Sequence, residues 1–217
     1  MSYKAAVFDL DGTVLDTFTD IKGSVNRSLS RCGLPLKTDY EIRMMIGMGV
    51  DEFIAAAMPP DTPDAKRAEF HRVFAEEYSA HQSDFTAPYA GIREALAVLR
   101  ENGVKIAVAS NKDEQFVVGL CEKHFPGVFD LAIGSRPGLR KKPEPDLVYA
   151  ALGALGVGKK DAVYIGDSEF DVITAKNAGV DGIAVLWGFR DKKQLWDSGA
   201  RVFAADAGEL TGLILSH

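Results

Sequence analysis

Apolar and polar positions follow two different rhythms along the chain, with a change near residue 88. The first apolar run, Ala5 to Phe8, is continuous, which predicts a strand buried on both faces of a parallel sheet. The following stretch shows helical spacing instead, and Thr38 with Glu41 forms a capping-box pattern within it. This stretch predicts four helices, over residues 20–31, 38–46, 50–58 and 62–82.

After residue 88, short apolar runs alternate with helical patterns. The predicted strands are 104–109, 131–134, 162–165 and 182–186, with a last short strand at 202–204. The predicted helices are 92–101, 115–123, 146–155 and 170–178. Such alternation folds into βαβ units with right-handed crossovers. We therefore predict an α/β protein with a doubly wound parallel sheet as its core, made of residues 1–15 and 88–217, and a small helical domain, residues 16–87, inserted into it.

Two carboxylates follow the first predicted strand directly. Asp9 and Asp11 are two residues apart, so in extended backbone both side chains point to the same side. They repel each other unless a cation lies between them, and a hard divalent ion such as Mg²⁺ prefers carboxylate ligands. The carboxyl ends of parallel strands are also where ligands bind in open α/β sheets. The pair therefore predicts a Mg²⁺ site at this edge of the sheet.

Polar side chains also follow two later strands. Ser110 and Asn111 come after the strand at 104–109, where a hydroxyl and backbone donors can hold a phosphate, although both residue types are also common helix N-caps. Asp167 follows the strand at 162–165 after a glycine that allows a tight turn, and Asp171 lies one helical turn further on. We expect Lys112, next to this group, to point to solvent.

One basic residue is held in a turn. Lys142 precedes a proline, which favours an extended backbone and suits an ammonium aimed into a site, although the neighbouring Arg140 and Lys141 also fit a solvated basic loop. Cys32 and Cys121 lie far apart in helical patterns, so we interpret both as reduced packing residues.

Composition narrows the class of partner. With 47% hydrophobic residues the chain can form a substantial core. A net charge of −6 and an isoelectric point near 5.3 argue against a nucleic-acid or membrane partner. The N-terminus leads straight into a strand without a leader pattern, and no apolar stretch approaches the ~20 residues that span a bilayer. We therefore expect a cytoplasmic protein.

Together, these segments resemble the haloacid dehalogenase-like hydrolase superfamily, whose pattern is DxD[GT]T, then [ST], K, and [GD]D followed by D. The first motif includes Gly12 and Thr13 as supporting residues. Within the superfamily the chain is similar to the phosphoglycolate phosphatase-type branch in six segments: 9–16, 88–91, 108–112, 142–145, 166–168 and 187–190. The resemblance implies a Rossmann-like core with an inserted helical cap.

The resemblance also implies a role for each motif residue. Asp9 attacks phosphorus to form an aspartyl-phosphate, and Asp11 acts as the acid and then the base. Mg²⁺ is bound by Asp9, the backbone carbonyl of Asp11 and Asp167. The transferring phosphoryl group is held by Ser110, Asn111 and Lys142. Asp171 orients Lys142 or supports the metal.

The implied activity is a Mg²⁺-dependent phosphatase for a small phosphorylated metabolite, with 2-phosphoglycolate as the first guess. A carboxylate at position 11 suits phosphatases and is not needed by dehalogenases. A phosphosugar mutase, a pyrophosphatase and a non-catalytic phosphate-binding protein stay open as alternatives, as do a monomer and a homodimer.

The predicted cap offers a candidate substrate loop. It lies between two helices and contains Gly47, Met48 and Gly49, which would allow it to close over the site. The nearby Arg43 is positioned to contact an anionic tail of the substrate. The alternative interpretation is an ordinary connector with a surface arginine.

Overall fold

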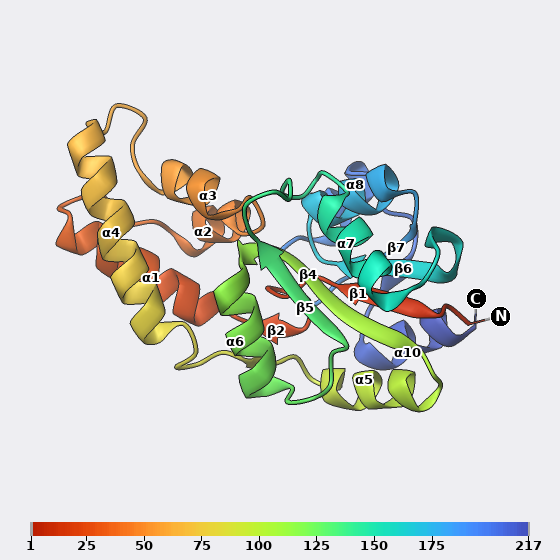
Figure 1. The fold of residues 1–217 in the computed structure, drawn as a ribbon. Helices are drawn as coiled ribbons and strands as arrows, with labels where there is room; N and C mark the ends of the chain where they lie inside the picture. Colours follow the sequence, from red (N-terminus) through yellow and green to blue (C-terminus); the bar gives the residue numbers. More distant parts are fainter. Residues whose placement is uncertain (1, 217) are drawn as a thin grey trace.

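A six-stranded parallel sheet forms the centre of the computed structural model, which describes residues 2–216 (Figure 1). Its strand order is β5-β4-β1-β6-β7-β8. The strands are β1 (Ala5–Phe8), β4 (Lys105–Asp113), β5 (Leu131–Ser135), β6 (Ala162–Gly166), β7 (Asp181–Val185) and β8 (Phe203–Ala204). The first strand thus lies in the middle of the sheet, so residues that follow it emerge between β4 and β6.

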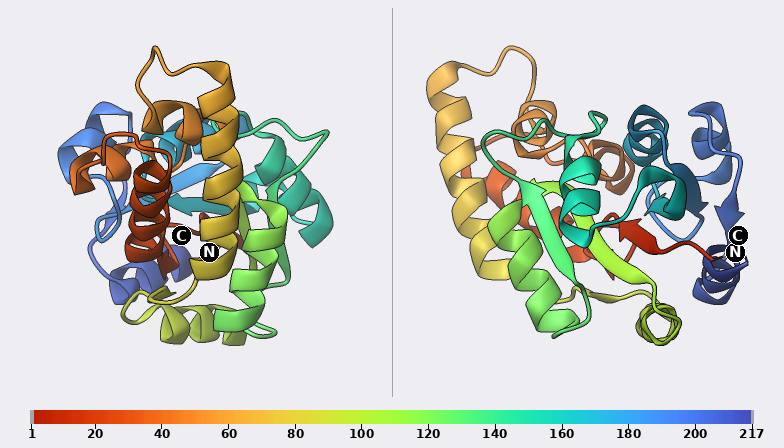
Figure 2. Two further views of the ribbon diagram at one scale, coloured as in Figure 1. Left: turned by 90° about the vertical axis from the view of Figure 1, so that its left-hand side faces the viewer. Right: turned by 45° about the vertical axis from the view of Figure 1, so that its right-hand side comes forward.

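Helices cover both faces of the sheet (Figure 2). On one face lie α5 (Ile92–Glu101), α6 (Glu114–His124) and α10 (Ala207–Leu215), and on the other lie α7 (Asp146–Leu155) and α8 (Glu169–Ala178). The short α9 (Lys192–Asp197) packs against the β7 side, and a 3₁₀ turn spans Lys159–Asp161. The predicted doubly wound α/β, Rossmann-like architecture is confirmed.

The continuous apolar run in β1 is explained by burial on both faces. Ala6 and Phe8 belong to the cluster beneath α5 and α10, whereas Ala5 and Val7 face α7. All four are at most 1% exposed. Because alternate residues of a strand point to opposite faces, a strand covered on both sides needs apolar residues at every position.

Four helices form the cap, which stands beyond the carboxyl ends of the strands (Figure 1). They are α1 (Phe18–Arg31), α2 (Asp39–Met45), α3 (Val50–Ala57) and α4 (Asp64–His81). The cap has its own apolar cluster. The expected capping box at Thr38 and Glu41 is present at the start of α2.

A two-stranded antiparallel ribbon connects the cap to the core. It consists of β2 (Leu15–Asp16) and β3 (Ala87–Pro88), with Leu15 opposite Pro88. The buried Asp20 on α1 accepts hydrogen bonds from the backbone N–H of Thr86, at 2.7 Å, and from its hydroxyl. The outgoing and returning chain segments are thereby tied to each other. Neither this ribbon nor α9 and α10 was anticipated from the periodicity.

Within residues 2–216, none of the helices combines the length and the apolar character that crossing a membrane requires.

Candidate active site

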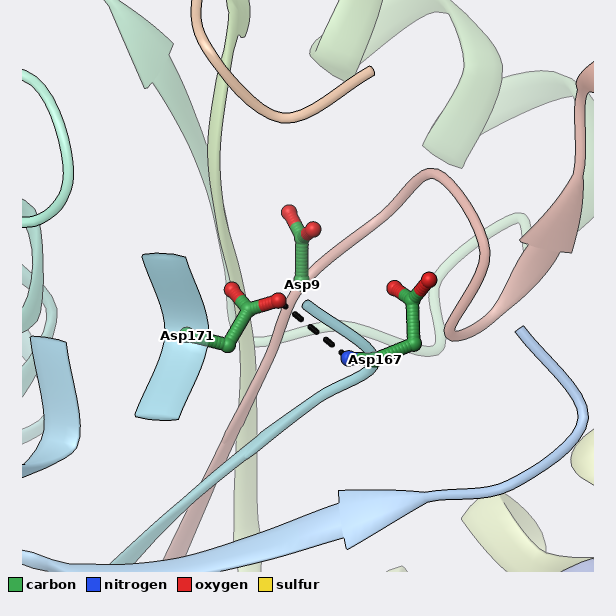
Figure 3. Close-up of side chains that lie close together, drawn as sticks. All are labelled: Asp9, Asp167 and Asp171. Carbon is green, nitrogen blue, oxygen red and sulfur yellow. Dashed lines mark hydrogen bonds between the residues drawn. The ribbon is translucent and has the colours of Figure 1, made fainter. Parts of the chain in front are cut away.

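Three buried carboxylates meet at the carboxyl edge of the sheet (Figure 3). Asp9 follows β1, Asp167 follows the neighbouring β6, and Asp171 comes from the first turn of α8. One oxygen of each carboxylate lies within 4.8 Å of the other two. The structure therefore brings together side chains that are up to 162 residues apart in sequence, as the strand-end argument predicts.

Asp171 is held by donors from its own turn. One of its oxygens accepts hydrogen bonds from the backbone N–H of Asp167 at 3.2 Å, and from the N–H and hydroxyl of Ser168 at 3.0 and 2.6 Å. Ser168 and Asp171 form the capping box of α8. The other oxygen lies 2.7 Å from the Lys142 ammonium and 3.2 Å from the Tyr164 hydroxyl. Asp171 therefore works here as an orienting group for Lys142.

Lys142 lies between two carboxylates. Its ammonium is 2.9 Å from Asp9 and 2.7 Å from Asp171, and its side chain is 1% exposed. Burial alone would lower the pKa of Lys142, but the charges of Asp171 and Asp9 raise it well above its usual value. The lysine is therefore a fixed cation beside Asp9.

Asn111 holds the backbone of Lys142. Its side-chain oxygen accepts from the N–H of Lys142 at 2.6 Å, and its amide nitrogen donates to the carbonyls of Lys142 and of the cap residue Gly47, at 3.0 and 2.9 Å. Both ends of this amide are therefore engaged by backbone groups. Ser110 is buried next to it, and its hydroxyl accepts only a long bond, 3.4 Å, from the N–H of Lys112.

The expectation that Lys112 points to solvent is wrong. Its ammonium lies 2.8 and 2.7 Å from the two oxygens of Asp11, and its side chain is 9% exposed. Burial lowers the pKa of Lys112, but Asp11 and Tyr78 together outweigh burial, so the pKa is raised above its usual value. The strand β4 continues through residue 113 rather than ending at 109, so Lys112 extends along the sheet edge toward Asp11 instead of outward.

Asp167 is positioned by its neighbours. One oxygen accepts from the Thr13 hydroxyl at 2.9 Å, and the other accepts from the backbone N–H of Phe189 at 2.8 Å. Gly12 has a φ of +85°, and a Cβ built on it would lie 2.4 Å from an Asp167 oxygen. A side chain at position 12 would therefore collide with this carboxylate, which explains the glycine physically.

The cluster carries more negative than positive charge. Burial raises the pKa of Asp9 to about 6, with Asp171 and Asp11 adding to the effect and Lys142 opposing it. Burial, followed by the charges of Asp171 and Asp9, raises the pKa of Asp167 to about 8. Oδ1 of Asp9 is buried and lies 2.9 Å from the Lys142 ammonium. When all three carboxyl groups are ionised, the ammonium of Lys142 leaves two negative charges, so the donor set fits a hard divalent cation.

The four cap residues named from the sequence do not share one location. Gly47 and Gly49 border the cavity beside Asp9, whereas Arg43 and Met48 are not among its described lining residues. The Arg43 guanidinium lies 3.9 Å from the centre of the Phe18 ring. The candidate substrate loop is thus at the site, but Arg43 is engaged in a cation–π contact elsewhere.

Three residues that support the site were given no role in it from the sequence: Lys112, Tyr164 and Arg190. Tyr164 is the one aromatic residue in β6, and its hydroxyl lies 3.0 Å from the Ala109 carbonyl. Arg190 is 3% exposed, and it donates to the carbonyls of Met44 and Ile46 at the end of α2. Tyr164 could have been noticed in the sequence, because its hydroxyl is the one polar side-chain group in an otherwise apolar strand.

A family model described as "Haloacid dehalogenase-like hydrolase" matches residues 6–185. The phosphoglycolate phosphatase of Caulobacter vibrioides is 35% identical over 191 residues, covering 85% of this chain and 80% of the relative. That of Pseudomonas savastanoi pv. phaseolicola is 30% identical over 213 residues, covering 95% and 78%.

Solved structures show the same likeness. A protein from Lactobacillus delbrueckii subsp. bulgaricus, with a provisional phosphoglycolate phosphatase assignment, is 36% identical and superposes with a TM-score of 0.95 over 100% of both chains. CbbY from Rhodobacter sphaeroides, solved in complex with phosphate, is 26% identical, with a TM-score of 0.80 over 96% of both chains.

The chain therefore belongs to the haloacid dehalogenase-like hydrolase family. Within this family it is a phosphoric monoester hydrolase of the phosphoglycolate phosphatase-like branch.

Proposed function

We propose that this protein is a Mg²⁺-dependent phosphatase that hydrolyses a small phosphorylated metabolite through an aspartyl-phosphate on Asp9. The observation that carries the proposal is the buried Asp9 carboxylate, which lies 2.9 Å from the Lys142 ammonium and borders a cavity between core and cap. A carboxylate placed in this way is a nucleophile that a phosphoester can reach.

The chain supplies each step of the reaction. Asp9 forms a bond to phosphorus while the bond to the ester oxygen breaks, and Asp11 gives a proton to the leaving alkoxide. Asp11 then takes a proton from the water that attacks the aspartyl-phosphate, which regenerates Asp9 and releases inorganic phosphate. Lys142 and Ser110 border the same cavity and are placed to hold the oxygens of the transferring group.

The candidate metal ligands are Asp9, Asp167 and the backbone carbonyl of Asp11, with Asp171 completing the acidic cluster. When bound, Mg²⁺ supplies the positive charge that offsets repulsion between an anionic nucleophile and an anionic ester. Thr13 and the Phe189 N–H keep Asp167 oriented for this role.

The activity test is phosphate release from a panel of phosphoesters, with Mg²⁺ or with EDTA. The panel begins with 2-phosphoglycolate, because relatives carry that substrate in their names. We expect release that depends on Mg²⁺ and falls by at least about 10³-fold in Asp9→Asn. The matched control is Asp61→Asn, which changes an exposed aspartate in the cap. Equal release by Asp9→Asn and the wild type would disprove the proposal.

A further inference from the structure

The cavity above Asp9 and Asp11 extends into the cap and is apolar there. Its volume is about 140 Å³. At its base are the two aspartates, Ser110 and Lys142, and it continues upward between α3, α4 and α6. The upper walls are formed mainly by Ile46, Val50, Phe53, Ile54, Phe74 and Phe116. A phosphoester bound at Asp9 would therefore project its organic part into an apolar chamber.

Cations in this chamber are already matched by carboxylates. Lys142 is paired with Asp9 and Asp171, and Lys112 is paired with Asp11. Asp113 adds a further acidic group to the wall and forms no salt bridge with any described residue. The remaining ionisable residues of the described lining are Tyr78 and His71, and His71 is exposed on α4. While Asp11 is ionised, a substrate carboxylate would meet no lysine or arginine of the described lining that lacks a carboxylate partner, and burying an unpaired charge is costly.

The aromatic wall also offers one neutral polar group. The rings of Phe53, Phe74 and Tyr78 follow one another at 5.6 and 5.7 Å between centres, and Phe116 meets Tyr78 edge-on at 5.2 Å. Tyr78 is 5% exposed, and its hydroxyl is buried with no hydrogen bond to a described residue. Burial raises the pKa of Tyr78 to about 12, so the hydroxyl is neutral at physiological pH. It can donate to, or accept from, a neutral group on a ligand.

The cap is closed over this chamber. Asn111 of the core donates to the carbonyl of Gly47, and the core residue Lys141 pairs with Asp51 and Glu52 at the start of α3, at 3.0 and 3.1 Å. The apolar walls therefore face the catalytic carboxylates in the arrangement in which substrate is enclosed.

We infer that the preferred substrates are phosphomonoesters with an apolar or aromatic body, and that 2-phosphoglycolate is disfavoured. An apolar cavity of about 150 Å³ accommodates a benzene ring, and the 140 Å³ here includes the space beside Asp9, so the organic part can be no larger than about one ring. This inference rests on the proposed phosphatase activity and names its substrate class.

The test compares three phosphoesters of primary alcohols. Benzyl phosphate fills the chamber, propyl phosphate has nearly the size of 2-phosphoglycolate without its carboxylate, and 2-phosphoglycolate carries the extra charge. We expect kcat/KM to fall in that order, with benzyl phosphate at least tenfold above 2-phosphoglycolate. A kcat/KM for 2-phosphoglycolate equal to or above that for benzyl phosphate overturns the inference while leaving the phosphatase proposal intact. Absence of release from all three, in the wild type and in Asp9→Asn alike, contradicts the phosphatase proposal itself.

A charge placed in the wall gives a second, independent readout. Val50 is only half-buried, at the start of α3, so Val50→Lys can add an ammonium at the chamber with little cost to packing. We expect Val50→Lys to lower the ratio of kcat/KM for benzyl phosphate over 2-phosphoglycolate at least tenfold, and Val50→Leu to preserve it. An unchanged ratio in a folded Val50→Lys protein would contradict the inference.

Discussion

Lys112 and Asp11 form an ion pair just beyond the point where β1 and β4 stop pairing, which is at Phe8 and Val108. The pair is nearly buried on both sides, with side-chain exposures of 9% and 10%. The candidate general acid is therefore held by a cation rather than by the metal cluster, which leaves Asp9, Asp167 and Asp171 as a separate group.

Removing both partners of this pair should cost less stability than the two single removals added together. Lys112→Met leaves an uncompensated carboxylate, so we expect its free energy of unfolding to fall by about 3 kcal/mol. In the double variant with Asp11→Asn the loss should be smaller than the sum of the two single losses, since no unpaired charge remains. Urea unfolding of the four proteins measures this, and additive losses would show that the pair is not coupled.

Gly12→Ala should damage the metal site beyond its effect on the backbone. The added methyl would lie 2.4 Å from an Asp167 oxygen, so Asp167 must move. The matched control is Gly103→Ala: Gly103 also has a positive φ, +77°, but nothing lies within 4 Å of its Cβ position. Both variants should lose about 1 kcal/mol of stability from the strained backbone. Only Gly12→Ala should weaken Mg²⁺ binding, by tenfold or more in calorimetry. Similar Mg²⁺ affinity in the two variants would contradict this geometry.

Stability and metal binding should respond to pH in opposite directions. The folded protein raises the pKa of Asp9 to about 6 and that of Asp167 to about 8, so it binds more protons than the unfolded chain between about pH 4 and 8. The metal-free protein should therefore lose stability as pH rises through this range.

Mg²⁺ competes with the same protons. We expect its affinity to rise roughly tenfold per pH unit between pH 6 and 8, and then to level off. Thermal melts with EDTA or Mg²⁺ at each pH separate the two effects. A metal-induced shift in Tm that is the same at pH 6 and pH 8 would contradict a site built on these carboxylates.

Arg190 should control the mobility of the substrate loop. Its guanidinium donates to the carbonyls of Met44 and Ile46 and also pairs with Glu169, at 2.7 Å. Arg190→Lys keeps the charge but loses the fork that makes several bonds at once. We expect a loss of about 2 kcal/mol in stability and faster amide exchange over residues 43–49. Arg72→Lys, on an exposed face of α4, is the control and should change neither.

The core strands were predictable because a strand that is buried on both faces has a continuous run of apolar residues in the sequence. Strand β1 is a continuous apolar run and β6 is buried throughout, whereas β7 is apolar and buried only over its last three residues. Helix α9 was not predicted because it is six residues long and buries only Leu195, so its sequence shows no helical periodicity of apolar residues. The ribbon of β2 and β3 escaped because a pair of two-residue strands has no periodicity at all.

The acidic residues and Lys142 were named from the sequence, but the position of Lys112 was not predicted correctly. Asp9 and Asp167 follow strands of one parallel sheet, whose carboxyl ends lie at the same edge, and the structure shows that these two strands are neighbours. The orientation of Lys112 depends on an irregular extension of β4, with a register shift against β5 between Ala109 and Asp113. An irregularity of this kind comes from tertiary pairing rather than from local sequence, so a loop position was the natural prediction.

Because β2 pairs with β3, the chain leaves the core for the cap and returns from it at the same place. The two ends of the cap are already hydrogen-bonded neighbours, and the Asp20 clamp on Thr86 binds them again. Because these ends are held together, replacing or shortening the residues between them changes the loop-closure entropy of folding only slightly. The carboxylates of the site lie in the core segments of the chain, whereas most of the chamber wall lies in the inserted cap. Substitutions within the cap can therefore change the substrate preference without altering the carboxylates.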